Sequence, residues 1–266
     1  MQGTLKRPDC SLYYEVAGCG PALVFAHGLG GNHLSWWQQV AHFSDRYTCV
    51  TFAHRGFAPS GPVPGASAPD GFADDLAALV DALGLDEVRL VAQSMGGWTC
   101  LDYALRHPTR VRALVMACTS GAIDPGSAPG FGAAAFDAWM RRASEAAAAL
   151  EARGILAASG ERMAREQPAF ATLYRQVYQM TPEDFRVAVR ARIRQLRSRP
   201  AAVLAELAAP VLFLNGEEDI VFPSPAGPGL AASAPRGRSA SVAKAGHSVY
   251  FERAAEFNRI VEAFIQ

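Results

Sequence analysis

Val91-Ala92-Gln93-Ser94-Met95-Gly96-Gly97 is the stretch that decides the fold of this 266-residue chain. An apolar run of strand length leads into Ser94, and a helical pattern begins directly after it. A nucleophilic serine on a tight strand-to-helix turn needs small neighbours, because the backbone folds back on itself there. The usual pattern is G-x-S-x-G, and here Ala92 and Gly96 occupy the two small positions. A serine that only caps a helix has the same local appearance, so its chemistry depends on what lies around it.

The rest of the chain repeats the alternation of strand and helix. Leu12–Val16 alternates like an edge strand, and helical patterns cover Asp74–Leu83, Met95–Arg106 and Val249–Ile265. Continuous apolar runs, typical of strands buried on both faces, occur at Ala22–Ala26, Cys49–Ala53, Val88–Ala92, Val111–Met116 and Val211–Leu214. We therefore predict an α/β fold with a mostly parallel sheet flanked by helices.

The alternation stops between residues 121 and 209. This segment opens with Gly and Pro, and then becomes rich in Ala and Arg with almost no strand-like runs. Strand rhythm resumes at Pro210, so we expect a helical insertion into one sheet rather than a second independent domain. The predicted organisation is a core of residues 1–120 and 210–266, with residues 121–209 as the helical insertion.

Two backbone amides are candidates to stabilise negative charge beside Ser94. The Met95 amide lies at a helix N-terminus, where it can donate to a developing oxyanion. A second strand runs into the glycine-rich loop His27-Gly28-Leu29-Gly30-Gly31, from which we select the Leu29 amide, with Gly30 as the fallback. The loop does not fit a dinucleotide-binding G-x-G-x-x-G, because His33 stands at the third glycine position. His27 is expected to brace the loop.

A serine nucleophile also needs a base and a group that orients the base. Asp219 follows the apolar run that ends at Leu214, and His247 lies on a glycine turn before the last helical pattern. Each follows a strand end, which is where open α/β sheets bind their ligands. A single loop aspartate or histidine is usually solvated surface, but both occur here together with the serine turn and the glycine loop.

Over nearly its whole length the sequence resembles the α/β-hydrolases of the esterase and lactonase branch. The resemblance implies that Ser94 is the nucleophile, His247 the base and Asp219 its orienting acid. It also implies that residues 121–209 form the helical cap that covers the site. The motifs that carry the resemblance are His27-Gly28-Leu29-Gly30-Gly31, Gln93-Ser94-Met95-Gly96-Gly97, Gly216-Glu217-Glu218-Asp219 and Gly246-His247-Ser248-Val249-Tyr250-Phe251-Glu252.

The function expected from these motifs is that of a serine hydrolase cleaving a small-molecule ester or lactone through an acyl-enzyme. A C–C bond (diketone) hydrolase or a natural-product tailoring enzyme would use the same triad. A hydrolase-fold ligand-binding protein with little turnover is the alternative from a different class. Serine at the nucleophile position counts against haloalkane dehalogenase and epoxide hydrolase chemistry, because those members of the fold use an aspartate there.

Two positions depart from the family pattern. Between Phe52 and Ser60, Ala53 replaces an aspartate that many relatives carry, and Ala58 replaces a glycine. The missing carboxylate puts local pairing of Arg55 in doubt, but it leaves the triad intact.

The residues that line the pocket are harder to identify. His27, Gly28, Trp36, Trp37, Phe57 and Trp139 are candidates, although any one of these aromatic side chains has an ordinary packing role as its alternative. Arginines recur on the expected helix before residue 200 and form one stripe. A solvated face is the simplest interpretation, and attraction of an acidic substrate is the functional one. The stripe consists of Arg186, Arg190, Arg194 and Arg197.

Composition excludes several function classes. The chain has 25 basic and 25 acidic residues, so we expect no nucleic-acid partner. No apolar run is long enough to span a membrane, and the first residues lack a secretory pattern, which leads us to expect a cytoplasmic protein. The five cysteines are scattered and no H-x-H or H-E-x-x-H motif occurs, so neither a metal nor a cofactor is expected. The expected partner is a small molecule with an ester, lactone or activated carbonyl, and the oligomeric state is left open.

Overall fold

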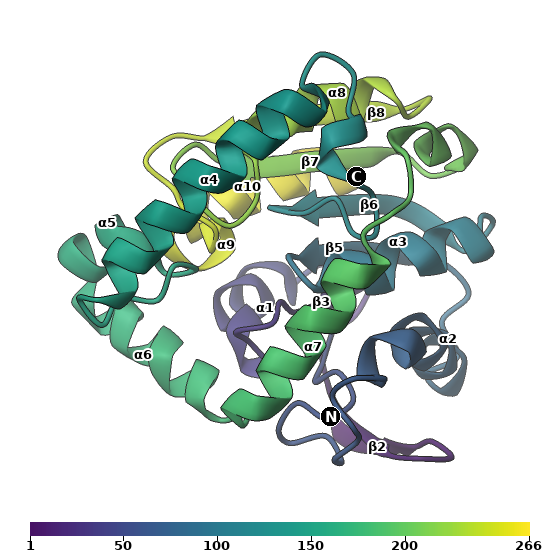
Figure 1. Ribbon diagram of the computed structural model, residues 1–266. Helices are drawn as coiled ribbons and strands as arrows, with labels where there is room; N and C mark the ends of the chain where they lie inside the picture. Colours follow the sequence, from purple (N-terminus) through teal and green to yellow (C-terminus); the bar gives the residue numbers. More distant parts are fainter.

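A computed structural model describes all 266 residues and contains one eight-stranded sheet in the order β1-β2-β4-β3-β5-β6-β7-β8 (Figure 1). The two pairs at the N-terminal edge, β1 with β2 and β2 with β4, are antiparallel, and every other pair is parallel. The strands are β1 (Gln2–Lys6), β2 (Ser11–Ala17), β3 (Ala22–Ala26), β4 (Thr48–Phe52), β5 (Val88–Gln93), β6 (Val111–Ala117), β7 (Val211–Gly216) and β8 (Gly237–Val242).

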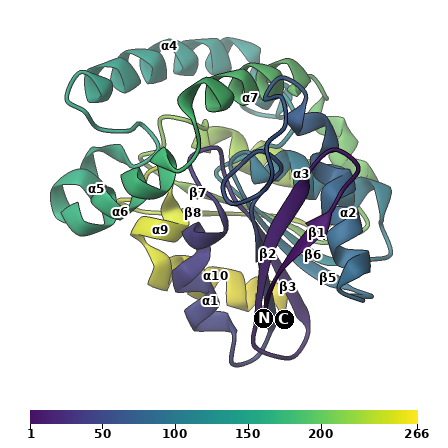
Figure 2. The same cartoon turned by 90° about the horizontal axis from the view of Figure 1, so that it is seen from below.

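Helices cover both faces of this sheet. Figure 2 shows α1 and α10 on one side and α2 and α3 on the other, so the sheet is the middle of three layers. No helix combines the length and the apolar character that crossing a lipid bilayer requires. The helices are α1 (Trp37–Phe43), α2 (Phe72–Ala82), α3 (Gly96–Arg106), α4 (Gly132–Glu151), α5 (Gly160–Glu166), α6 (Pro168–Gln179), α7 (Glu183–Leu196), α8 (Gly227–Ala232), α9 (Val249–Glu252) and α10 (Ala254–Ile265).

The predicted α/β class is confirmed, and the differences from prediction lie at the sheet edges and the C-terminus. β1 and β8 were not predicted, because their exposed, largely polar sequences lack the apolar run of a central strand. As a result β2, expected at the edge, lies between β1 and β4. The single helix expected over Val249–Ile265 is divided at Arg253, whose backbone angles are not helical.

The register of the parallel strands places their carboxyl ends at one edge of the sheet. Ala26 at the end of β3 pairs with Ala92 of β5, and Ala117 of β6 pairs with both Gln93 and Leu214. The loops that follow these strands therefore begin side by side. The glycine loop, the Ser94 turn and the Asp219 loop are thus close in space although distant in sequence.

The segment of residues 121–209, predicted to be a helical insertion, contains α4, α5, α6 and α7 and contributes no strand to the sheet. Figure 2 shows α4 and α7 lying across one end of the sheet, opposite the chain termini. Its side chains contact the loops at the carboxyl ends of the strands. Phe185 of α7 packs edge-on against Phe57, and Arg162 of α5 donates to Glu218 at 2.6 and 2.8 Å. The insertion therefore lies over the edge of the sheet where the predicted site residues meet.

Candidate active site

Ser94 lies on a sharp turn between β5 and α3, and its backbone has a φ of 50°. Non-glycine residues rarely adopt this left-handed conformation, and it occurs where a turn must present a side chain. The turn also brings α3 close to β3, because a Cβ on Gly96 would lie 2.2 Å from the carbonyl oxygen of Ala26. A small residue at position 96 is therefore a steric requirement, as the sequence pattern predicts.

The structure brings Ser94, His247 and Asp219 together in one chain of hydrogen bonds. The Ser94 Oγ lies 2.8 Å from the His247 Nε2, and the His247 Nδ1 lies 2.9 Å from the Asp219 Oδ2. His247 and Asp219 are buried, and Ser94 is half-buried. The second Asp219 carboxylate oxygen accepts the backbone N–H groups of Val221 and Phe222 at 2.7 and 2.9 Å. The carboxylate is thus held in place from both sides, with one oxygen directed at the imidazole.

Two side chains that the sequence analysis gave no role hold the His247 loop. Gln93, next to Ser94, donates from its Nε2 to the His247 carbonyl at 3.0 Å. Glu252 accepts the Gly246 backbone N–H at 2.7 Å, and burial raises the pKa of this carboxyl to about 7. Both residues stood inside quoted motifs, but neither sequence spacing nor residue type predicts a hydrogen bond to a backbone group on a distant loop.

The backbone N–H groups of Leu29 and Met95 have no hydrogen-bond partner within the protein. Met95 immediately precedes the first residue of α3, so its N–H belongs to the free amides of a helix N-terminus. Leu29 follows Gly28, where a Cβ would lie 2.1 Å from the Gln93 side chain and 3.1 Å from the Ser94 Cβ. The glycine therefore allows this loop to lie directly against the serine turn.

His27 braces the glycine loop. Its Nδ1 donates to the Gly28 carbonyl at 2.8 Å, and its Nε2 accepts the His54 backbone N–H at 2.9 Å. This pattern requires a neutral ring with the proton on Nδ1. Complete burial lowers the pKa of His27 to about 3, so the ring stays neutral at physiological pH.

The predicted aromatic pocket residues are dispersed. Trp36 has no exposed surface and packs in the core against Phe25 and Tyr250. Phe57 is equally buried, on His27. Trp37 is 44% exposed and contacts Phe170 edge-on, and Trp139 is half-buried on α4 and stacks on Phe136. Neither Trp36 nor Phe57 reaches open space in this conformation.

The arginine stripe on α7 does not behave as one surface. Arg186 is buried, stacks on Tyr178 and donates to backbone carbonyls of Tyr178 and Thr181. Arg190 and Arg194 are exposed. The helix ends before Arg197, whose guanidinium lies 5.0 Å from the centre of the Trp98 ring. Helical spacing identified the stripe, but the packing of α7 against the core separates its members.

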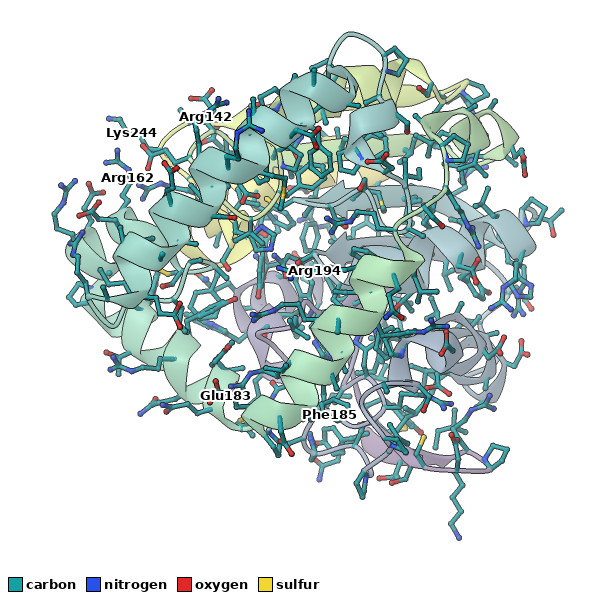
Figure 3. All side chains as sticks on the ribbon, viewed as in Figure 1. Arg142, Arg162, Glu183, Phe185, Arg194 and Lys244 are labelled. Atoms are coloured by element: carbon teal, nitrogen blue, oxygen red, sulfur yellow. The ribbon has the colours of Figure 1, made fainter.

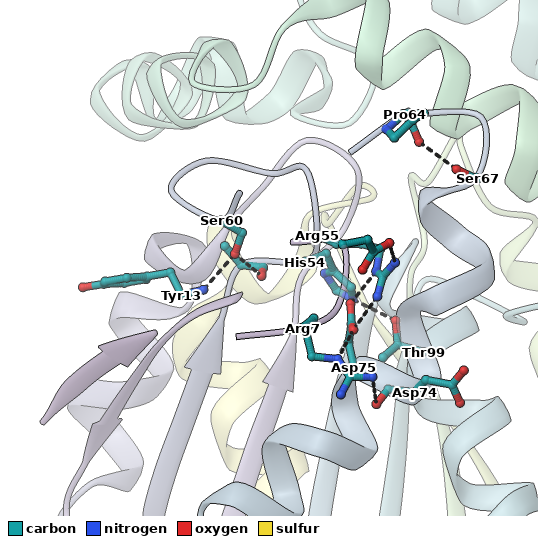
Figure 4. Close-up of polar contacts among 12 residues, drawn as sticks. Arg7, Tyr13, His54, Arg55, Ser60, Pro64, Ser67, Asp74, Asp75 and Thr99 are labelled. Atoms are coloured by element: carbon teal, nitrogen blue, oxygen red, sulfur yellow. Dashed lines mark hydrogen bonds and ion pairs between the residues drawn. The ribbon is translucent and has the colours of Figure 1, made fainter. Parts of the chain in front are cut away.

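Arg55 is paired despite the alanine at position 53. Its Nε and one terminal nitrogen donate to the two Asp75 oxygens at 2.6 and 2.7 Å, and the other terminal nitrogen donates to Asp9 at 2.7 Å. Arg7 also donates to Asp75 at 2.9 Å (Figure 4). The doubt about local pairing is therefore resolved by carboxylates that lie elsewhere in the chain.

One group of side chains has the donor types of a metal site. Potential ligand atoms of Cys118, Asp219 and His247 lie within 4.8 Å of one another. Burial, reinforced by Asp219, raises the pKa of the Cys118 thiol well above its ordinary value. Metals bind the thiolate, and the facing Asp219 and His247 atoms are already hydrogen-bonded to each other. This donor set therefore fits a metal poorly.

Comparison with known proteins identifies the family of the fold. The model of the α/β-hydrolase fold family matches residues 21–254. A protein named putative carbamate hydrolase, from Serratia proteamaculans, is 28% identical over 94% of both chains. The 3-oxoadipate enol-lactonase 2 of Acinetobacter baylyi is 34% identical over 45% of this chain and 46% of its own. The match thus spans about half the length of some curated relatives and nearly all of others.

Solved structures extend the likeness over the whole chain. The enol-lactonase from Burkholderia xenovorans has a TM-score of 0.76 and 23% identity, with 99% of both chains covered. A thermophilic esterase from Thermogutta terrifontis has a TM-score of 0.77 and 21% identity, covering 100% of this chain and 98% of its own. At these identities the likeness establishes the fold.

Proposed function

Because the chain belongs to the α/β-hydrolase fold family, we propose that it is a serine hydrolase that cleaves a small-molecule ester or lactone through an acyl-enzyme. The observation that carries this proposal is the chain of hydrogen bonds from Ser94 through His247 to Asp219. The free Leu29 and Met95 amides beside it support the same chemistry. The relatives named enol-lactonase and esterase support the substrate class.

Acylation begins with attack of the Ser94 Oγ on the substrate carbonyl carbon, while the His247 Nε2 takes the hydroxyl proton. Asp219 orients the imidazole through Nδ1 and stabilises the imidazolium that forms. The carbonyl oxygen becomes an oxyanion and accepts hydrogen bonds from the Leu29 and Met95 amides. The tetrahedral intermediate then collapses: the bond to the leaving oxygen breaks, and His247 returns the proton to that oxygen.

Deacylation repeats these steps with water as the nucleophile. His247 takes a proton from the water, whose oxygen attacks the acyl carbon. Collapse of the second intermediate breaks the bond to the Ser94 Oγ, which regains its proton from His247. The products are a carboxylic acid and an alcohol, and a lactone gives both groups in one molecule.

The helical insertion acts in this proposal as the cap of residues 121–209 over the core. It is tied to the His247 loop at two points: the Ser248 hydroxyl donates to the Ala158 carbonyl at 2.7 Å, and the Gln167 side chain donates to the Glu252 carbonyl at 3.1 Å. A cap held against the loop that carries the base limits which substrates reach Ser94.

A fluorophosphonate probe tests the proposal, because it reacts only with an activated serine. We expect labelling of Ser94 in the wild type, identified by mass spectrometry, and none in Ser94→Ala. Ser35→Ala is the matched control, because Ser35 is a buried serine whose hydroxyl is hydrogen-bonded to the Asn32 N–H and not to the triad, and its variant should still be labelled. Absence of wild-type labelling, under conditions that label a known esterase, would favour a ligand-binding protein and reject the enzyme.

Aryl esters of increasing acyl length, together with a small lactone panel, then identify the substrate class. We expect turnover of at least one of these series by the wild type and loss of it in Ser94→Ala. Incorporation of ¹⁸O from labelled water into the acid product distinguishes hydrolysis from a lyase or cyclisation reaction, in which water does not enter the product.

A further inference from the structure

Arg197 is a half-buried charge that forms no ion pair within the protein. Its side chain makes no hydrogen bond or ion pair, and its Nε is buried without a partner. The two buried arginines differ in this respect, because Arg55 pairs with Asp75 and Arg186 donates to carbonyls of the chain. Its two terminal nitrogens are not buried and donate to no group of the protein, so the Arg197 guanidinium is available to a ligand that supplies hydrogen-bond acceptors.

Arg197 lies against α3, the helix that follows Ser94. The guanidinium lies 5.0 Å from the centre of the Trp98 ring, and Trp98 donates its backbone N–H to Met95 in the first turn of α3. Trp98 and Met95 belong to one buried apolar cluster, against which Leu29 packs. Trp98 thus connects Arg197 to the apolar cluster around the two residues that carry the proposed oxyanion amides.

The charges around Arg197 reinforce one another. Arg194, one turn earlier at the C-terminal end of α7, is exposed and makes no ion pair (Figure 3). Burial, with repulsion from Arg194, lowers the pKa of Arg197 to about 10, so it stays charged at neutral pH. Asp124 is the one carboxylate that offsets this, without forming an ion pair. The N-terminus of α3 adds further positive potential.

We propose that Arg197, assisted by Arg194, forms a subsite for a carboxylate of the substrate, so that the protein acts on esters or lactones that carry a free acid group. This inference rests on the proposed function and specifies its substrate class. The planar guanidinium suits it, because its nitrogens match the two oxygens of a carboxylate. A bound carboxylate would supply acceptors for Arg197 and reduce its repulsion with Arg194.

A matched pair of substrates tests the subsite. The 4-nitrophenyl monoester of glutaric acid carries a carboxylate, and its methyl 4-nitrophenyl diester has the same chain without the charge. We expect wild-type kcat/KM to favour the acid by about tenfold or more. In Arg197→Gln, kcat/KM for the acid should fall about 10- to 100-fold, as expected for a hydrogen-bonded charge. For the neutral diester it should change less than about threefold.

Arg190→Gln is the matched control, because Arg190 lies on the same helix but is exposed, and it should alter neither substrate by more than about twofold. Equal losses on both substrates in Arg197→Gln, or a wild-type preference for the diester, would overturn the subsite. Arg197→Gln should fold with a melting temperature close to that of the wild type, since the Arg197 side chain makes no hydrogen bond or ion pair in the protein. A lower melting temperature with equal losses would identify a structural role.

A binding measurement separates this inference from the proposed function. Glutarate should bind to Ser94→Ala by calorimetry, and Ser94→Ala with Arg197→Gln should lose about tenfold or more of that affinity. If neither ester is hydrolysed but glutarate binding depends on Arg197, the hydrolase proposal fails and the anion subsite stands. If both esters are hydrolysed and glutarate binding is the same in the two variants, the subsite fails and the hydrolase stands.

Discussion

Replacement of Glu252 by glutamine changes the charge, but not the shape, of the side chain that supports the His247 loop. Glu252 is 4% exposed and accepts the Gly246 N–H at 2.7 Å. A glutamine carbonyl can accept the same hydrogen bond. Glu252 lines a cavity of about 340 Å³ between α4, α5 and the core loops. The variant therefore measures the free energy of ionising the Glu252 carboxyl in this place.

The magnitude follows from the pKa of Glu252. Burial, together with the negative charges of Asp219 and Glu218, raises it from 4.5 to about 7, although the Gly246 N–H and Arg253 act in the opposite direction. Each pKa unit corresponds to about 1.4 kcal/mol, so the difference costs the folded state about 3 kcal/mol once Glu252 is ionised. The folded protein binds the Glu252 proton more tightly than the unfolded chain does. The protonated carboxyl therefore stabilises the fold below about pH 4.5, and this stabilisation is lost as pH rises from about 4.5 through about 7.

Urea unfolding at pH 5 and pH 8 measures this cost. We expect Glu252→Gln to exceed the wild type in unfolding free energy at pH 8 by up to about 3 kcal/mol, and by much less at pH 5. Glu256→Gln is the control, because Glu256 is exposed on α10, and it should show no such pH-dependent gain. A gain for Glu252→Gln that is the same at both pH values would refute the reasoning.

Three further predictions concern the hydrogen bond between Asp219 and His247, the serine turn and the glycine loop. Asp219→Asn should lower kcat on a hydrolysed aryl ester by about 10⁴ while the fold is retained, because the imidazole loses its orienting acceptor. Gly96→Ala should destabilise the fold by more than Gly84→Ala does in urea unfolding, because its Cβ would lie 2.2 Å from the Ala26 carbonyl oxygen. Gly84→Ala, with no atom within 4 Å of its Cβ, should cost only the roughly 1–2 kcal/mol of a left-handed alanine. His27 is neutral when folded, with its pKa lowered from 6.5 to about 3, so unfolding free energy should fall as pH drops below about 6.5, and His27→Gln should weaken that dependence in urea titrations.

Local sequence patterns were sufficient to predict the elements whose structure depends on neighbouring residues. The five central strands were predicted because both faces of each are buried, which requires a continuous apolar run. The Ser94 turn was predicted because its backbone tolerates only small residues at position 96. By contrast, β1 and β8 escaped prediction, because an edge strand exposes one face and needs no such run.

Side-chain partners distant in sequence follow from the packing of the whole chain. The carboxylate that pairs with Arg55 comes from α2 rather than from its own strand end. Four arginines at helical spacing looked equivalent, yet α7 buries Arg186 among carbonyls of the chain, and Arg197, just beyond the helix, is half-buried over Trp98 without an ion pair. Backbone conformation depends on steric contacts between neighbouring residues, so the local amino-acid sequence predicts it. The surroundings of a charge depend on which surfaces meet, and for Arg197 these are set by the docking of the helical insertion on the core.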